Sequence, residues 1–119
     1  MGETFHYEHR FKSSKEEVFY RIVSWLKSEG AVITKEKVPD DVEAVHGSLK
    51  ALAVWKKTAE KRMSFALSED SEGVKVSLVM EPASKMYDDD VYVWRNKIQT
   101  SWGQLANDIW TSIERSQIE

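Results

Sequence analysis

The sequence predicts an α+β domain in which an antiparallel sheet wraps around a long C-terminal helix, with one shorter helix after the first strand. Three observations support this fold class. An alternating strand pattern is followed at once by a helix-capping motif. Further alternating strands fill the middle of the chain, and the last third carries apolar residues at helical spacing. A helix and a sheet must each bury one apolar face, so we expect the two to pack as two layers.

The composition indicates one globular domain spanning residues 1–119. Hydrophobic residues make up 41% of the chain and charged residues 31%, which is typical of a folded protein. The chain contains no cysteine, so disulfides, thiolate catalysis and cysteine-based zinc sites are excluded. The three histidines show no metal-site spacing and no nucleotide-binding motif occurs, so we expect neither a metal nor a cofactor.

The charge pattern argues against nucleic acid as a partner. The net charge is -3 and the lysines are scattered among acidic residues, so no basic patch is formed. No apolar run approaches the roughly 20 residues that a membrane-spanning helix needs, and the first residues lack a secretory signal pattern. We therefore expect a cytoplasmic protein without a membrane span.

The first predicted strand covers residues 4–12 and leads into a capped helix. Ser14 and Glu17 form a capping box, in which a hydroxyl and a carboxylate three residues later satisfy free backbone N–H groups. The helix is predicted over residues 15–29, and Gly30 occupies the position of a left-handed cap. One face of the strand carries mainly aromatic residues and a histidine: Phe5, Tyr7, His9 and Phe11.

The middle of the chain predicts several antiparallel strands. Alternation and β-branched residues place them at about 31–37, 42–48, 62–68 and 74–81, with a turn at Pro39 and a hairpin loop over residues 69–73. Residues 48–60 fit both a helical and a strand period. We favour a strand at about 51–57, because connections between neighbouring strands are usually short.

The final helix carries one continuous apolar stripe. Its members are spaced three or four residues apart: Val91, Trp94, Ile98, Trp102, Leu105, Ile109 and Ile113. Trp94, Trp102 and Trp110 recur every eight residues, and each such step rotates by about 80° around a helix. Trp94 and Trp102 are therefore predicted to face the sheet, whereas Trp110 is predicted to point toward the rim. Gly103 lies mid-helix on the side opposite Trp94, where close approach of a neighbour would explain it.

This order of elements resembles the small helix-grip domains of the START and birch-pollen-allergen (SRPBCC) superfamily. The residues that carry the resemblance are the strand Phe5–Phe11, the capped helix from Ser14, the hairpin Arg62–Glu81 and the helix Val91–Ile113. The resemblance implies a curved sheet around the C-terminal helix, with an apolar ligand such as a lipid, steroid or polyketide held between them. It implies no catalytic residue.

A pocket between sheet and helix would be lined by the same side chains that otherwise form a dry core. The candidates are Trp94, Ile98, Trp102 and Leu105 from the helix, Met63, Phe65, Leu67, Val76 and Leu78 from the strands, and Tyr7, His9 and Arg95 as polar groups. The basic residues Lys56, Lys57, Lys61 and Arg62 offer a small anion patch as an alternative. Glu60 interrupts this run, so we interpret them as solvated charges at a strand end.

Three functions remain open at this stage. The first is non-enzymatic binding of a small apolar ligand, with Trp94 and Trp102 as walls. The second is a protein-interaction or self-association module, in which Trp110, Tyr92 and Trp55 form the surface because aromatic residues are enriched in interface hot spots. The third is an enzyme of the cyclase or hydratase type, which requires several inward-facing polar groups.

Overall fold

The computed structural model describes residues 4–47, 60–82 and 95–118. Its elements follow in the order β1 (Phe5–Phe11), α1 (Lys15–Ser28), β2 (Val32–Lys37), β3 (Asp41–His46), β4 (Lys61–Asp70), β5 (Gly73–Pro82) and α3 (Arg95–Ile118). This order confirms the predicted α+β class. The strand predicted at 51–57 and the start of the final helix lie outside the described residues.

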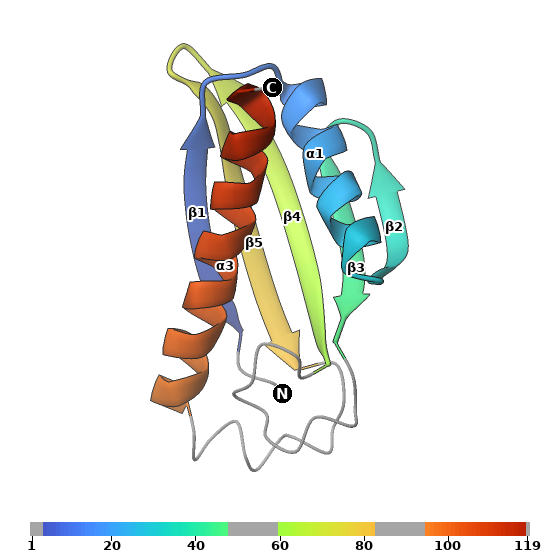
Figure 1. The fold of residues 1–119 in the computed structure, drawn as a ribbon, viewed down its shortest axis with the longest axis vertical. Helices are drawn as coiled ribbons and strands as arrows, with labels where there is room; N and C mark the ends of the chain where they lie inside the picture. The colour runs from blue at the N-terminus through green and yellow to red at the C-terminus, as the bar shows by residue number, and fades with distance from the viewer. Residues whose placement is uncertain (1–3, 48–59, 83–94, 119) are drawn as a thin grey trace.

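The five strands form one antiparallel sheet in the order β1-β5-β4-β3-β2. Both helices lie on the same face of this sheet, with α3 over the β1 and β5 side and α1 over the β3 and β4 side (Figure 1). Buried and more exposed residues alternate along β3 and β5, because only one face of the sheet is covered by helices. α1 joins β1 to β2, which lie at opposite edges.

Both predicted ends of α1 are confirmed. The Ser14 hydroxyl accepts a hydrogen bond from the Glu17 backbone N–H at 3.2 Å, which satisfies one free donor of the first turn. At the other end Gly30 has a φ of 73°, and the Ala31 N–H donates to the Leu26 carbonyl at 3.0 Å. These contacts form a Schellman cap, so the chain turns sharply from α1 into β2.

The hairpin between β4 and β5 is tighter than the sequence predicts. Asp70 pairs directly with Gly73, so the turn consists of residues 71–72 and the predicted five-residue loop is wrong. Arg10 on β1 donates to both carboxylate oxygens of Asp70, at 2.8 and 2.7 Å. Asp70 also accepts a hydrogen bond from the Glu72 N–H at 2.9 Å. These contacts keep Asp70 in β4. Composition alone assigns this polar residue to a loop.

The apolar stripe of α3 faces the sheet as predicted. Its five described members are buried: Ile98, Trp102, Leu105, Ile109 and Ile113. The Trp102 ring meets the Phe5 ring of β1 edge-on, with ring centroids 5.4 Å apart, a favoured geometry for aromatic pairs. Among the described residues, no helix is long and apolar enough to cross a membrane.

The prediction that Trp110 points toward the rim is wrong. Its side chain is 5% exposed. The Trp110 ring stacks on His9, with centroids 5.7 Å apart and planes at 16°, and meets Phe11 edge-on at 6.0 Å. β1 runs alongside α3 (Figure 1), so a residue on the shoulder of the apolar stripe still contacts the sheet. Trp110 therefore belongs to the core.

Candidate functional site

The predicted pocket residues within the described ranges pack against one another. Eight of them are at most 6% exposed: Met63, Phe65, Leu67, Val76 and Leu78 of the sheet, and Ile98, Trp102 and Leu105 of α3. Together they form part of one buried apolar cluster between helix and sheet. Arg95 is exposed, and Trp94, Tyr92 and Trp55 lie outside the described residues. Whether any of these residues contacts a ligand or a partner stays a prediction.

Tyr7 explains the glycine in the middle of α3. A Cβ atom placed on Gly103 would lie 3.4 Å from Cε1 of Tyr7, so the ring packs closely against the helix backbone. The Tyr7 hydroxyl donates to the Gln99 carbonyl at 3.1 Å. Burial raises the pKa of Tyr7 to about 12, because the charged form is poorly solvated there. Tyr7 thus holds β1 against α3 as a neutral group.

His9 also links β1 to α3, at the surface. Its Nε2 lies 2.6 Å from a carboxylate oxygen of Glu114, and its ring stacks on Trp110. The His9 side chain is 36% exposed and that of Glu114 is 52% exposed. An ion pair in such a position contributes little to stability. We therefore assign His9 a local packing role at the edge of the sheet.

A second group of polar residues is buried where β3 ends and β4 begins. Lys61 is the first residue of β4, on the same face as Met63, and it is 0% exposed. Its Nζ lies 3.1 Å from Nδ1 of His46, the last residue of β3. The same Nζ lies 5.5 Å from the centre of the Trp102 ring, within range of a cation–π interaction. The interpretation of Lys61 as a solvated charge is wrong.

Two residues from the end of α1 complete this group. Nε2 of His46 lies 3.3 Å from a carboxylate oxygen of Glu29, and the His46 ring stacks on Trp25 with centroids 5.6 Å apart and planes at 21°. A His46 tautomer with its proton on Nε2 donates to Glu29 and leaves Nδ1 to accept from Lys61. We call Glu29, His46 and Lys61, with Trp25 and Trp102 beside them, the lysine cluster.

Burial changes the protonation of the lysine cluster. It lowers the pKa of Lys61 to about 7, and the charge of Glu29 opposes this change only in part. The pKa of His46 is lowered as well, first by burial and then by the nearby charge of Lys61, while Glu29 acts in the opposite direction. Near neutral pH the lysine therefore loses its proton far more readily than a solvated lysine does. Strongly shifted, buried groups of this kind are candidate functional residues.

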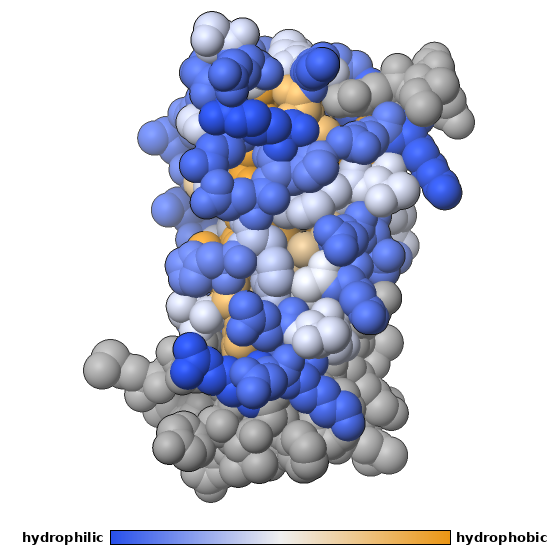
Figure 2. All heavy atoms as spheres, turned by 90° about the vertical axis from the view of Figure 1, so that its left-hand side faces the viewer, coloured by the Kyte–Doolittle hydropathy of each residue, from blue (hydrophilic) through white to orange (hydrophobic). Residues whose placement is uncertain are grey.

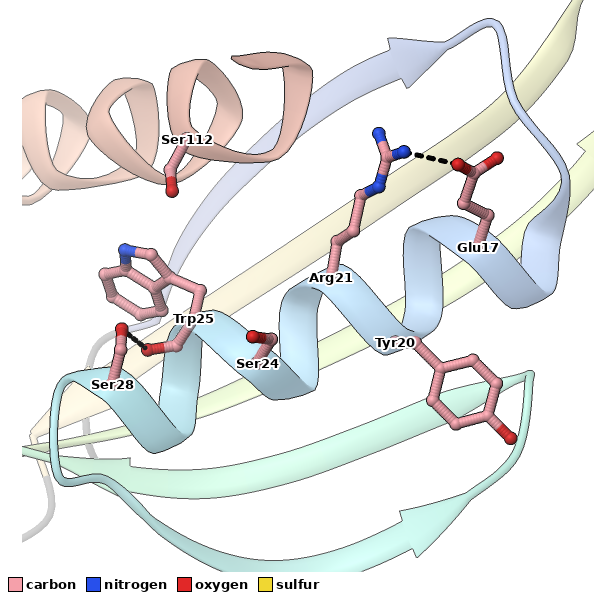
Figure 3. Close-up of a pocket in the computed structure, with 7 residues that line it drawn as sticks. All are labelled: Glu17, Tyr20, Arg21, Ser24, Trp25, Ser28 and Ser112. Carbon is pink, nitrogen blue, oxygen red and sulfur yellow. Dashed lines mark hydrogen bonds and ion pairs between the residues drawn. The ribbon is translucent and has the colours of Figure 1, made fainter. Parts of the chain in front are cut away.

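A groove of about 480 Å³ lies beside the lysine cluster, between α1 and α3. In Figure 3, Arg21, Trp25 and Ser112 point into the gap between the two helices, whereas Tyr20 points to the opposite side of α1. Arg21 donates to the Ile113 carbonyl of α3 at 3.3 Å and pairs with Glu17. Trp25 is shared, because it lines the groove and also stacks on His46.

Sequence reasoning missed the lysine cluster although strand parity contains a signal for it. Lys61 has the parity of Met63 and Phe65, and His46 has the parity of Val42 and Ala44. In a strand, residues two apart share a face, so both polar residues fall on the buried side. The charge of Lys61 favours a solvated position, whereas its place in the alternating pattern puts it on the buried face of β4. In the structure Lys61 lies on the buried face.

Comparisons with known proteins identify the fold. No family model and no curated protein matches the sequence. The structure is similar to protein MLL2253 from Mesorhizobium loti, with a TM-score of 0.60 and 10% identity over 95% of this chain and 98% of that one. ChR145 from Cytophaga hutchinsonii gives a TM-score of 0.57 with 8% identity, over 98% and 97% of the two chains. TTHA0849 from Thermus thermophilus gives 0.53 with 9% identity, over 96% and 99%.

These likenesses extend over almost the whole of each chain, so the overall fold is shared. Identities of 8 to 10% are too low to transfer any site residue. The function must therefore be argued from the side chains of this protein.

The surface formed by β1 and α3 offers little to an apolar partner. Figure 2 shows this side of the molecule as mainly hydrophilic, with small, separate apolar patches. Interaction surfaces usually carry larger continuous apolar areas. The burial of Trp110 is consistent with this view, since its ring contacts His9 and Phe11 of the same chain. Self-association stays a prediction without support from this face.

Proposed function

We propose that the protein is a helix-grip domain that binds a small, largely apolar molecule carrying one polar group. The binding site consists of the groove between α1 and α3 together with the lysine cluster behind Trp25. The single observation that carries this proposal is the buried Lys61, which stands in a row of apolar residues and contacts His46. A polar anchor among apolar side chains is typical of a ligand site, and Lys61 meets this description, while the adjacent groove is lined mostly by polar residues.

The groove supports this proposal by its size and position. Its volume of about 480 Å³ falls within the range of roughly 300–1,000 Å³ that small-molecule sites occupy. Trp25 offers an aromatic face, and the serines around it offer hydroxyl groups. The apolar side chains farther along α3 belong to one buried cluster, and we place the ligand at the lysine cluster, where the groove lies beside it.

Binding at Lys61 requires side chains to move. Lys61 is completely covered in this structure, while Trp25 is only partly buried and contacts both the groove and His46. Because Trp25 lines the groove and stacks on His46, we propose that its rotation connects the groove with the cluster. We therefore expect ligand binding to change the fluorescence of Trp25.

Tryptophan emission provides the first test. The protein is titrated with octanol, octanoate and a sterol, and the purified protein is examined by native mass spectrometry for a retained small molecule. We expect saturable quenching or a spectral shift with at least one probe, and we expect Trp25→Phe to remove most of that change. The matched control is Trp110→Phe, because Trp110 lies in the other aromatic cluster and its replacement leaves the binding signal in place.

Two results would overturn the proposal. One is an unchanged spectrum with every probe together with a protein that retains no small molecule. The other is a signal that disappears in Trp110→Phe and persists in Trp25→Phe, which would place the binding site beside β1.

A further inference from the structure

We propose that Lys61 is an amine nucleophile that forms an imine with an aldehyde or ketone group of the bound molecule. This inference rests on the proposed function, because the carbonyl compound must first enter the same site. It adds a covalent reaction and a substrate class, namely apolar carbonyl compounds.

The geometry of the lysine cluster supports this assignment. A nucleophile beside a base, with a third group that orients the base, is the usual arrangement of an activated nucleophile. Lys61 Nζ lies 3.1 Å from Nδ1 of His46, and Nε2 of His46 lies 3.3 Å from Glu29. Lys61 is thus the nucleophile, His46 the base and Glu29 a positioning residue. The three come from β4, β3 and the end of α1.

The surroundings favour the neutral amine that the reaction needs. An amine attacks a carbonyl only when its nitrogen lone pair is free, and burial in apolar surroundings supplies this state near neutral pH. The pKa of Lys61, at about 7, agrees with this requirement. Trp102 and Trp25 flank the site and provide the apolar surface on which the rest of the molecule can pack.

The reaction balances without an oxidant or a reductant. The Lys61 nitrogen forms a bond to the carbonyl carbon, and one amine proton passes through His46 to the carbonyl oxygen, giving a carbinolamine. The nitrogen lone pair then forms the carbon–nitrogen double bond as the carbon–oxygen bond breaks. The remaining nitrogen proton passes through Nδ1 of His46 to the departing hydroxyl, which leaves as water. The products are the imine and one water molecule.

Reductive trapping tests the proposal. The full chain is incubated at neutral pH with octanal and sodium cyanoborohydride, and intact mass and peptide mapping locate the adduct. We expect one adduct per chain, with the mass of octanal less one oxygen atom, on Lys61. Lys61→Arg and Lys61→Met should both lack this adduct. Circular dichroism shows whether each variant is folded. Two different replacements are made so that the result does not depend on one variant that fails to fold.

Further variants separate catalysis from simple exposure. Lys35→Arg, on the exposed strand β2, should be labelled at Lys61 as fast as the wild type. His46→Gln should slow labelling by about 100-fold or more, the usual effect of removing a general acid–base group. Glu29→Gln should slow it less, and Glu29→Asp should recover part of the rate, which a purely structural role of Glu29 does not predict.

Octanol distinguishes failure of this inference from failure of the proposed function. It matches octanal in length but cannot form an imine. Saturable octanol binding combined with selective labelling of Lys61 supports both proposals. Octanol binding with octanal adducts spread over surface lysines overturns the imine and leaves the binding function in place. Absence of octanol binding and of Lys61 labelling overturns both.

Discussion

The same trio of side chains occurs twice in this protein, once beside β1 and once beside the buried Lys61. At the surface, His9 stacks on Trp110 and contacts Glu114 at 2.6 Å. Beside Lys61, the buried His46 stacks on Trp25 and contacts Glu29 at 3.3 Å, and the Glu29 side chain is 43% exposed. The two stacks are nearly alike, with ring centroids 5.7 and 5.6 Å apart.

The two regions differ in burial and in what lies behind the histidine. The His9 side chain is 36% exposed, whereas that of His46 is 8% exposed and has Lys61 at its other nitrogen. Water screens the ion pair of His9 and Glu114, so this pair contributes little to stability. At the other trio, burial lowers the pKa of the adjacent Lys61, and Glu29 opposes this change in part. Burial together with one additional lysine thus converts a packing motif into a candidate reactive site.

The largest expected difference between the two regions is in stability. Trp110→Ala removes an almost completely buried indole, and we expect a loss of about 3–5 kcal/mol in the free energy of unfolding. Trp25→Ala removes a partly buried ring beside the groove, and we expect roughly half that loss because less surface is buried. Urea denaturation measures both values. Equal losses would show that Trp25 is as much a core residue as Trp110.

The second largest expected effect is a change of stability with pH, caused by the lowered pKa of Lys61 in the folded protein. Its pKa is about 7 in the folded protein, whereas an unfolded lysine holds its proton up to a pKa of about 10.4. The unfolded state therefore binds more protons between these values, and stability rises with pH in this window. The limiting slope is roughly 1.4 kcal/mol per pH unit.

Urea denaturation of the wild type and Lys61→Met between pH 7 and 9 measures this slope. We expect the variant to lack this rise, whereas Lys35→Met on the exposed β2 should retain it. A wild-type stability that is flat or falls across this range, with no difference from Lys61→Met, would mean that the lysine is charged and solvated.

The smallest effects concern the two glutamates. Glu114→Gln affects a pair that is largely exposed, so we expect a loss below about 1 kcal/mol that shrinks further in high salt. Glu29→Gln removes the negative charge that raises the pKa of Lys61. In that variant the rise of stability with pH should begin at lower pH. If Glu114→Gln moved this onset and Glu29→Gln did not, the assignment of Glu29 to the surroundings of Lys61 would be wrong.

The fold was predictable because its signals are local. Each signal acts within a few residues of the chain. The alternating pattern specifies β1, the Ser14 hydroxyl starts α1, and Gly30 with its positive φ ends it. The hairpin loop was predicted too long because Asp70 is held by Arg10 of a distant strand. Trp110 was misplaced for a similar reason, since its burial depends on how far β1 extends beside α3.

The candidate site was less predictable because it depends on contacts between distant segments. Parity places Lys61 and His46 on the covered face, but no local pattern indicates that Glu29 and Trp25 from α1 meet them there. Such contacts depend on the packing of α1 on the sheet. The depressed pKa of Lys61 follows from that packing and not from the residue type.

The position of β1 has a consequence for the order of folding. The pairings β2–β3, β3–β4 and β4–β5 join strands that follow one another in the chain, whereas β1 pairs with β5, with Phe5 opposite Met80. Closing so long a loop costs more entropy than closing a hairpin. We therefore expect β1, which is synthesised before the other strands, to join the sheet last. During synthesis, a nascent chain must keep the aromatic face of β1 unpaired until β5 has emerged.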